Sequence, residues 1–213
     1  MGILEIHSNL ARLERLIGQW PGLLSTSQAE VGAGLVEDSL VLLDHLGPIH
    51  TLVDVGSGAG LPGLPLKIAR PDLTVTLIES NKDKAAFLVR ACAELGLEGV
   101  TVVARRAEEA GQHPDLRESF DAAVARALAP MQILVEFCLP FVKVGGRFLA
   151  QKTNSEDVES ARHAIEVLGG RLEAIHEAPS AARIHGTVVQ IAKIAPTPAA
   201  YPRRVGVPAR KPL

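Results

Sequence analysis

The chain of 213 residues has little cysteine and no long apolar stretch. Cys92 and Cys138 are its only cysteines, too few for a disulfide framework or a zinc site. No run of eighteen apolar residues occurs, so no membrane span is expected. The first twenty residues carry charges every few positions and lack the apolar core of a signal peptide. These absences favour a cytoplasmic protein.

What is present suits one α/β domain, because 47% of the residues are hydrophobic and can form a sizeable core. The formal net charge of -2 gives no general signal for nucleic-acid binding, but the charge is unevenly spread. The segment 195–213 contains no acid and four bases, Arg203, Arg204, Arg210 and Lys211. A mildly acidic body therefore carries a basic, proline-rich tail.

Helix-like and strand-like segments alternate through the chain. A helical period over residues 3–19 predicts one helix, and a second is expected over about 28–46. Nearly continuous apolar runs then predict parallel strands covered on both faces. The predicted strands are 50–55, 73–79, 100–104, 120–125, 146–152, 171–178 and 187–194, and the predicted helices are about 62–70, 82–95, 105–111, 128–140 and 155–170, the last capped by Ser155. This order predicts a doubly wound α/β domain with an N-terminal helical extension.

The stretch "LVDVGSGAGLPG", residues 52–63, places a glycine loop after the first predicted strand. Glycines at 56, 58 and 60 would let backbone N–H groups approach a ligand without obstruction by side chains. The spacing is not the dinucleotide fingerprint, because Leu61 stands where its third glycine belongs. The loop also lacks the lysine and hydroxyl residue of a P-loop. A tight structural turn without a ligand is the alternative.

Acids at two strand ends favour a nucleoside that bears an amino-acid group. Asp54 can take up the ammonium of an amino acid, and Glu79 can accept two ribose hydroxyls. S-adenosylmethionine has both parts. After the third strand, Ala107 can pack on the adenine ring and Glu108 can bond its amine, although a solvated helix start explains Glu108 equally well.

The sequence lacks the motifs that are typical of several other classes of methyltransferase. No D/N-P-P-Y/F follows the fourth strand, both cysteines fall on predicted core positions, and no acid cluster or metal site is predicted. Guanine N7 has a lone pair and no proton to remove, so its methylation requires alignment more than a base. Arg126 and Lys152, at the ends of the fourth and fifth strands, are candidates to position the substrate; a surface salt bridge and a solvated strand end are their alternatives.

The segments "DVGSGAGLPGLPLKIARPDLTVTLIES", "RAEE", "VARALAP", "VGGRFLAQK" and the ending "PTPAAYPRRVGVPARKPL" resemble the bacterial ribosomal RNA small-subunit methyltransferase G family, also called glucose-inhibited division protein B. The likeness runs from about residue 37 to 213. It implies a class I S-adenosylmethionine-dependent methyltransferase fold, Rossmann-like with a seven-stranded, mostly parallel sheet. It also implies guanine-N7 methylation of 16S ribosomal RNA. The cofactor contacts that it implies are Gly56, Leu61, Glu79, Ser80, Asn81, Ala107, Glu108 and Arg126.

The N-terminal part departs from the family pattern. "EDSL" is present at 37–40, but Gly34 stands where the family has a histidine, and "LLSTS" replaces an Asn-Leu-Thr element. The expected division is a helical extension at 1–46, a methyltransferase domain at 47–194 and a tail at 195–213.

The expected partners are small-subunit ribosomal RNA or the 30S particle, bound by a monomer. The prolines of the tail are expected to exclude a helix, so that its four bases lie extended along RNA. In the alternative, the tail packs on the domain through Tyr201 and Val205. Rival functions are a small-molecule methyltransferase, a non-catalytic RNA-binding module and, more distantly, a dinucleotide oxidoreductase.

Overall fold

A computed structural model describes residues 2–24 and 34–213. Its strands form one seven-stranded sheet in the order β3-β2-β1-β4-β5-β7-β6. The first five strands run parallel, and β7 is antiparallel to both β5 and β6. The strands are β1 (Thr51–Val55), β2 (Thr74–Ile78), β3 (Val100–Val103), β4 (Phe120–Arg126), β5 (Val142–Thr153), β6 (Gly170–Glu177) and β7 (Gly186–Lys193). All seven predicted strands are therefore confirmed, with β5 beginning earlier than expected.

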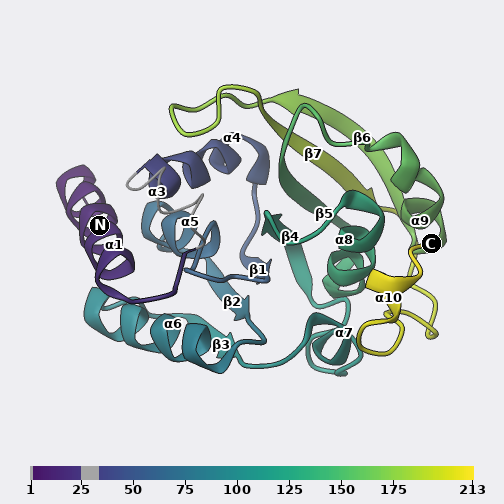
Figure 1. Ribbon diagram of the computed structural model, residues 1–213, viewed down its shortest axis with the longest axis horizontal. Coiled ribbons are helices and arrows are strands. Elements are labelled where there is room, and N and C mark those ends of the chain that lie inside the picture. Colours follow the sequence, from purple (N-terminus) through teal and green to yellow (C-terminus); the bar gives the residue numbers. More distant parts are fainter. Residues whose placement is uncertain (1, 25–33) are drawn as a thin grey trace.

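Helices cover both faces of the sheet, as Figure 1 shows. One face carries α1 (Ile3–Gln19), α3 (Gly34–Ser39), α5 (Gly63–Ala69) and α6 (Lys82–Leu95); the other carries α7 (Ala107–Ala110), α8 (Met131–Cys138) and α9 (Arg162–Val167). Shorter elements are η1 (Leu40–Leu42), α4 (Leu43–Leu46), η2 (Leu139–Phe141), η3 (Glu159–Ala161) and α10 (Val207–Arg210). Among the described residues, no helix has both the length and the apolar character needed to cross a membrane.

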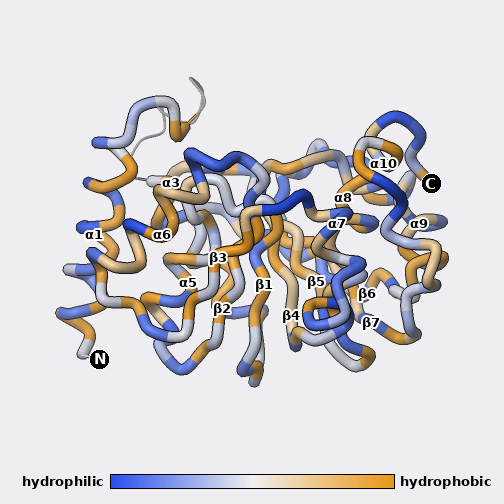
Figure 2. The backbone as a smooth tube through the Cα atoms, turned by 90° about the horizontal axis from the view of Figure 1, so that it is seen from below, coloured by the Kyte–Doolittle hydropathy of each residue, from blue (hydrophilic) through white to orange (hydrophobic). Residues whose placement is uncertain are grey.

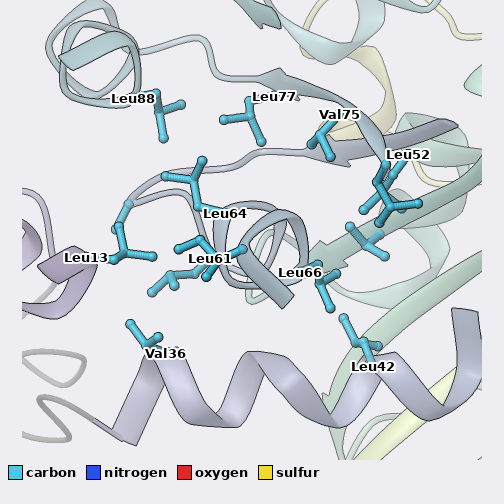
Figure 3. Close-up of a cluster of buried hydrophobic side chains, with 14 of the residues drawn as sticks. Leu13, Val36, Leu42, Leu52, Leu61, Leu64, Leu66, Val75, Leu77 and Leu88 are labelled. Carbon is cyan, nitrogen blue, oxygen red and sulfur yellow. The ribbon is translucent and has the colours of Figure 1, made fainter. Parts of the chain in front are cut away.

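Two apolar cores follow from the alternation of side chains along the strands. Leu52 of β1 points into the core beneath α1, α3, α5 and α6, whereas its neighbour Val53 points into the core beneath α8 and α9. In Figure 3, Leu13 from α1, Val36 from α3 and Leu64 from α5 converge in the first of these cores. In Figure 2 hydrophobic colours are frequent along the central strands, in agreement with the burial of these residues.

The N-terminal helix is confirmed, and its buried residues Leu13 and Ile17 dock it on the domain. The second predicted helix is confirmed only in part. Residues 34–46 form α3, η1 and α4 in succession, and the expected start at 28–33 lies outside the described residues. Residues of all three proposed parts contribute to the two cores. The division of the chain at residues 46 and 194 stays a prediction.

The helix expected over 155–170 is wrong in extent and in its cap. Only Glu159–Ala161 and Arg162–Val167 are helical. Ser155 bonds the hydroxyl of Thr153 instead, while the carboxylate of Asp157 accepts from the Ser160 N–H at 3.1 Å. Residues 154–158 connect the end of β5 to the start of the helical segment, so they are not helical themselves.

The C-terminal tail folds back over the domain and contains a helical turn. Figure 1 shows α10 beside α7 and α8. The expectation that prolines exclude a helix is wrong here, because Pro208 occupies the first turn, where its missing N–H leaves no helical bond unmade. Pro202 and Pro208 are buried, whereas Val205 is 43% exposed and is not the expected anchor.

Candidate functional site

The loop between β1 and α5 is built from residues that can take left-handed backbone angles. Gly56, Gly58 and Gly60 have φ angles of 74°, 54° and 83°. A Cβ on Gly56 would lie 2.5 Å from the Leu128 side chain, and one on Gly60 would lie 2.4 Å from Leu64. A Cβ on Gly58 would meet only the Gly56 carbonyl, at 3.8 Å, among the described residues. Gly60 is therefore required by core packing, and Gly58 faces open space.

The N–H groups of this loop were expected to approach a ligand, but most of them form hydrogen bonds within the protein. The N–H groups of Gly56 and Ser57 donate to Ile78 O, and those of Gly60 and Leu61 donate to Ser57 O. Gly58 N–H donates to the Glu79 carboxylate at 2.9 Å. The loop is thus a fixed scaffold rather than a row of free donors, and Leu61 is 4% exposed.

Asp54 lies beneath the loop and is fully buried. Its Oδ2 accepts from the Gly63 N–H at 2.9 Å, and its Oδ1 has no hydrogen-bond partner among the described residues. Burial raises the pKa of Asp54 to about 7, against the opposing effects of the Gly63 bond and the Arg126 charge. Asp54 positions the loop directly, and a contact with a ligand stays a prediction.

Glu79 connects the two loops that follow β1 and β2. Its Oε1 accepts from the Asn81 N–H at 2.7 Å and its Oε2 from Gly58. Since each carboxylate oxygen has further lone pairs, Glu79 can still accept from a ligand. Ser80 is exposed next to it. The Asn81 side chain caps α6 by accepting from the N–H groups of Asp83 and Lys84, which is a structural role.

Three neighbouring cavities lie along the carboxyl ends of the central strands, with volumes of about 500, 270 and 410 Å³. We name them cavities A, B and C. Cavity A is lined by Glu79, Ser80, Ala107 and Glu108 among others, cavity B by Gly58, Glu79, Lys84 and Arg126, and cavity C by Asp38, Arg126, Gln151, Lys152 and Arg183. Leu128 lines all three. The cavities therefore form a row with one shared partition.

Cavity A is lined both by the segment that follows β3 and by the C-terminal tail. Ala107 is half-buried in its wall, and Glu108 is 7% exposed. Glu108 Oε1 accepts from the Gly206 N–H at 3.0 Å. The alternative of a solvated helix start is therefore wrong for Glu108.

Arg126 is held between cavities B and C by a buried acid. Its side chain is 8% exposed, and its guanidinium donates to Leu35 O at 3.0 Å and lies 3.5 Å from Asp38 Oδ2. Burial lowers the pKa of Arg126, while the charges of Asp38 and Asp54 oppose that change. Arg126 is thus not a surface salt bridge: it is a fixed charge in the wall of both cavities.

Asp38 gathers groups from distant parts of the chain. It accepts from the Gln151 amide at 3.0 Å, from the Ser180 hydroxyl at 2.5 Å and from Arg183 Nε at 3.3 Å. These bonds fix the Gln151 amide with its nitrogen toward Asp38. Gln151 Oε1 and Arg183 Nη2 are buried and have no partner among the described residues. Both side chains line cavity C, and each keeps one unpaired polar atom buried behind its wall.

Lys152 is 8% exposed and not a solvated strand end. Its Nζ donates to Ala129 O at 2.5 Å and lies 3.2 Å from Glu156 Oε2. Beside it, Ala127 has a φ angle of 51°, which is unusual for a residue with a side chain. Backbone strain of this kind is concentrated at functional sites.

The cysteines are unsuited to nucleophilic chemistry. Burial raises the pKa of Cys92 to about 11, and it raises that of fully buried Cys138 as well. A thiolate, the reactive form, is therefore scarce near neutral pH at both positions. This agrees with their expected place in the core.

The four basic residues of the tail do not act alike. The Arg203 guanidinium donates to both oxygens of Glu136, which is fully buried, at 2.5 to 3.1 Å. Arg203 therefore has a structural role, because it holds the tail on the domain. Arg204, Arg210 and Lys211 are exposed.

The structure brings most predicted site residues together, around cavities A, B and C. Asp54, Gly60 and Asn81 lie behind the walls, and Arg203 is tied to Glu136. Sequence reasoning did not place Asp38, Gln151, Arg183 and Leu128 at the site. "EDSL" was the one signal for Asp38, and nothing in the sequence pattern marks Arg183.

Comparisons with known proteins agree with this geometry. The chain matches the family model for rRNA small subunit methyltransferase G over residues 16–184. A protein named "Ribosomal RNA small subunit methyltransferase G" from Roseiflexus castenholzii is 51% identical over 164 residues, which is 76% of this chain and 70% of the relative. One of the same name from Moorella thermoacetica is 44% identical over 193 residues, covering 88% of this chain and 80% of the relative.

Solved structures with the same fold are more distant in sequence. A T. thermophilus 16S rRNA N2 methyltransferase, in complex with AdoMet and guanosine, superposes with a TM-score of 0.52 at 18% identity, covering 76% of this chain and 40% of that chain. A geranyl diphosphate C-methyltransferase from Streptomyces coelicolor gives 0.57 at 15% identity, covering 74% and 79%. These likenesses show the class I methyltransferase fold. The family match and the close relatives show more: this chain belongs to the rRNA small subunit methyltransferase G family.

Proposed function

We propose that this protein transfers a methyl group from S-adenosylmethionine to N7 of one guanine in 16S ribosomal RNA. Family membership supports methyl transfer to ribosomal RNA. The observation that carries the proposal is the row of cavities over the carboxyl ends of the strands. Open α/β sheets bind ligands at this edge, where the strand order reverses. Here the reversal lies between β1 and β4, beside cavity B.

The residues around cavities A and B fit the cofactor. Gly58 leaves open the space that a side chain would fill, and Glu79 keeps lone pairs for ribose hydroxyls. Ala107 offers an apolar surface to adenine in cavity A, and the carboxyl group of the amino-acid part would lie near Lys84 and Arg126 in cavity B. The two volumes together fall within the usual range of about 300–1,000 Å³ for small-molecule sites. When bound, the cofactor supplies an electrophilic methyl group.

Cavity C is the proposed place of the guanine, next to Arg126. The Watson–Crick edge of guanine has an acceptor, O6, and donors on N1 and N2, which is the edge that enzymes read on an extruded base. The unpaired donor of Arg183 and the unpaired acceptor of Gln151 match these groups in kind, and each side chain would turn toward the cavity to reach them. Adenine presents the opposite pattern at the first two positions and would be disfavoured.

The proposed chemistry requires no general base in cavity C. N7 carries a lone pair and no proton, so the protein must align the base, hold it still and exclude water. Arg126 and Lys152 are positioning residues in this proposal, because Asp38 holds the first side chain in place and Glu156 the second. A ribosomal substrate would place the protein in the cytoplasm. Action as a monomer is also part of the proposal.

Methyl transfer to small ribosomal subunits is the direct test. Subunits from cells that lack the homologous enzyme are incubated with the protein and labelled S-adenosylmethionine. The expected product is label at one guanine of 16S RNA, with chain cleavage there after reduction and aniline treatment, which is specific for N7 methylation. Label on another atom would contradict the N7 assignment. Cofactor binding without transfer to subunits or free 16S RNA would favour the RNA-binding module or the small-molecule enzyme.

A further inference from the structure

The C-terminal tail is held on the domain by partly buried hydrogen bonds and an ion pair. The Arg117 guanidinium donates to Tyr201 O and Thr197 O, each at 2.7 Å. Further along, Arg203 forms its paired bonds with the carboxylate of buried Glu136. Such charge-assisted paired bonds fix direction as well as position. The segment that follows Arg203 is therefore held in one place.

That segment forms a wall of cavity A. Val205, Gly206 and Ala209 line the cavity together with Ala107 and Ile78. The Gly206 N–H closes the gap by donating to Glu108 Oε1 at 3.0 Å. In Figures 1 and 2, α10 lies on the same side of the sheet as α7 and α8, whose residues also line cavity A. Apolar residues of the tail and of the domain thus line one common space of about 500 Å³.

We propose that residues 205–209 of the tail are part of the cofactor site and hold the adenine ring against Ala107. The inference rests on the proposed function, because it takes cavity A as the adenine end. A flat apolar ring between Val205 and Ala209 on one side and Ala107 on the other would lose contact with water on both faces. The tail then does more than meet RNA, and its removal should weaken cofactor binding.

A substitution in the wall tests this without loosening the tail. Ala209→Trp places a large ring in cavity A, and overpacking by that much should reduce affinity for S-adenosylhomocysteine about tenfold or more. Ala199→Trp is the matched control, since Ala199 is exposed in the same tail and does not line cavities A, B or C. Calorimetry gives both affinities, and circular dichroism checks that both variants are folded.

The end of the ligand that is affected can be identified with methylthioadenosine, which lacks the amino-acid group. Ala209→Trp should weaken binding of this ligand by the same factor, because the obstruction lies at the adenine end. Deuterium exchange of the wild-type protein provides a second measurement. The amides of residues 203–211 should exchange more slowly when S-adenosylhomocysteine is bound.

The outcomes separate the two proposals. If the wild-type protein does not bind S-adenosylhomocysteine, the proposed function fails. If it binds, and Ala209→Trp and Ala199→Trp have equal affinities, the role of the tail is overturned. If Ala209→Trp does not fold, exchange decides: unchanged rates at 203–211 would overturn the inference.

Discussion

Glu79 accepts hydrogen bonds from two loops, so a substitution there changes the protein as well as its proposed contact with the ribose. Replacing it with alanine should weaken binding of S-adenosylhomocysteine by about 1.5–3 kcal/mol, the worth of hydrogen bonds to a charged group, or roughly ten- to a hundredfold. Part of that loss would come from the freed Gly58 and Asn81 N–H groups. A ligand without ribose hydroxyls separates the two effects: it should bind wild type weakly, and Glu79→Ala should reduce its affinity much less. Equal losses for both ligands would show that Glu79 only holds the loops.

Asp54 makes stability depend on pH in an unusual direction. Its folded pKa of about 7 lies above the ordinary value of 3.8, so the native state holds a proton that the unfolded chain has lost between these values. The free energy of unfolding should therefore fall as the pH rises from about 4 to 7. Asp54→Asn should remove this contribution while keeping an acceptor for the Gly63 N–H. Urea unfolding of both proteins across this range measures the difference, and identical slopes would contradict the prediction.

At the scale of elements, Asp38 joins α3 to β4, to β5 and to the segment after β6. Asp38→Asn would leave the buried Arg126 guanidinium without its acid, and breaking a buried pair costs about 3–5 kcal/mol. Glu37→Gln is the control, because Glu37 is exposed on the same helix and a change there should stay within about 0.5 kcal/mol. Urea unfolding compares the two. A loss below about 1 kcal/mol for Asp38→Asn would show that the pairing contributes little net stability.

The elements differ in how far the sequence predicts them. β1, β2 and β4 are buried along most of their length, so their apolar runs alone identify them, and α6 is also marked by its Asn81 cap and Gly96 end. Local pattern fails where tertiary contacts decide. α10 forms around Pro208 because neighbouring tail residues are already held by Glu136 and Glu108. Likewise, Asp38 meets Arg183 across 145 positions, a separation that no local signal spans.

For the whole molecule, the surface that meets RNA is the least constrained part of the proposal. Arg204, Arg210 and Lys211 are exposed, so changing these three to glutamine should weaken RNA binding and lower its salt slope by up to about two for single-stranded contacts. Arg203 is kept, because its loss would leave Glu136 buried and unpaired. Binding of 16S RNA at several salt concentrations gives the slope. If the slope does not change, the RNA surface lies elsewhere on the molecule.

The wall formed by residues 205–209 carries a thermodynamic consequence if the same segment also meets RNA. Two ligands that share one ordered segment are linked: whatever factor RNA contributes to cofactor affinity, the cofactor must contribute to RNA affinity. We expect this coupling to be positive, because either ligand would already have restricted the segment that the other needs. After transfer, release of the modified RNA would then loosen the hold on the spent cofactor. The protein would thus exchange spent cofactor for new cofactor after one RNA has left and before the next one binds.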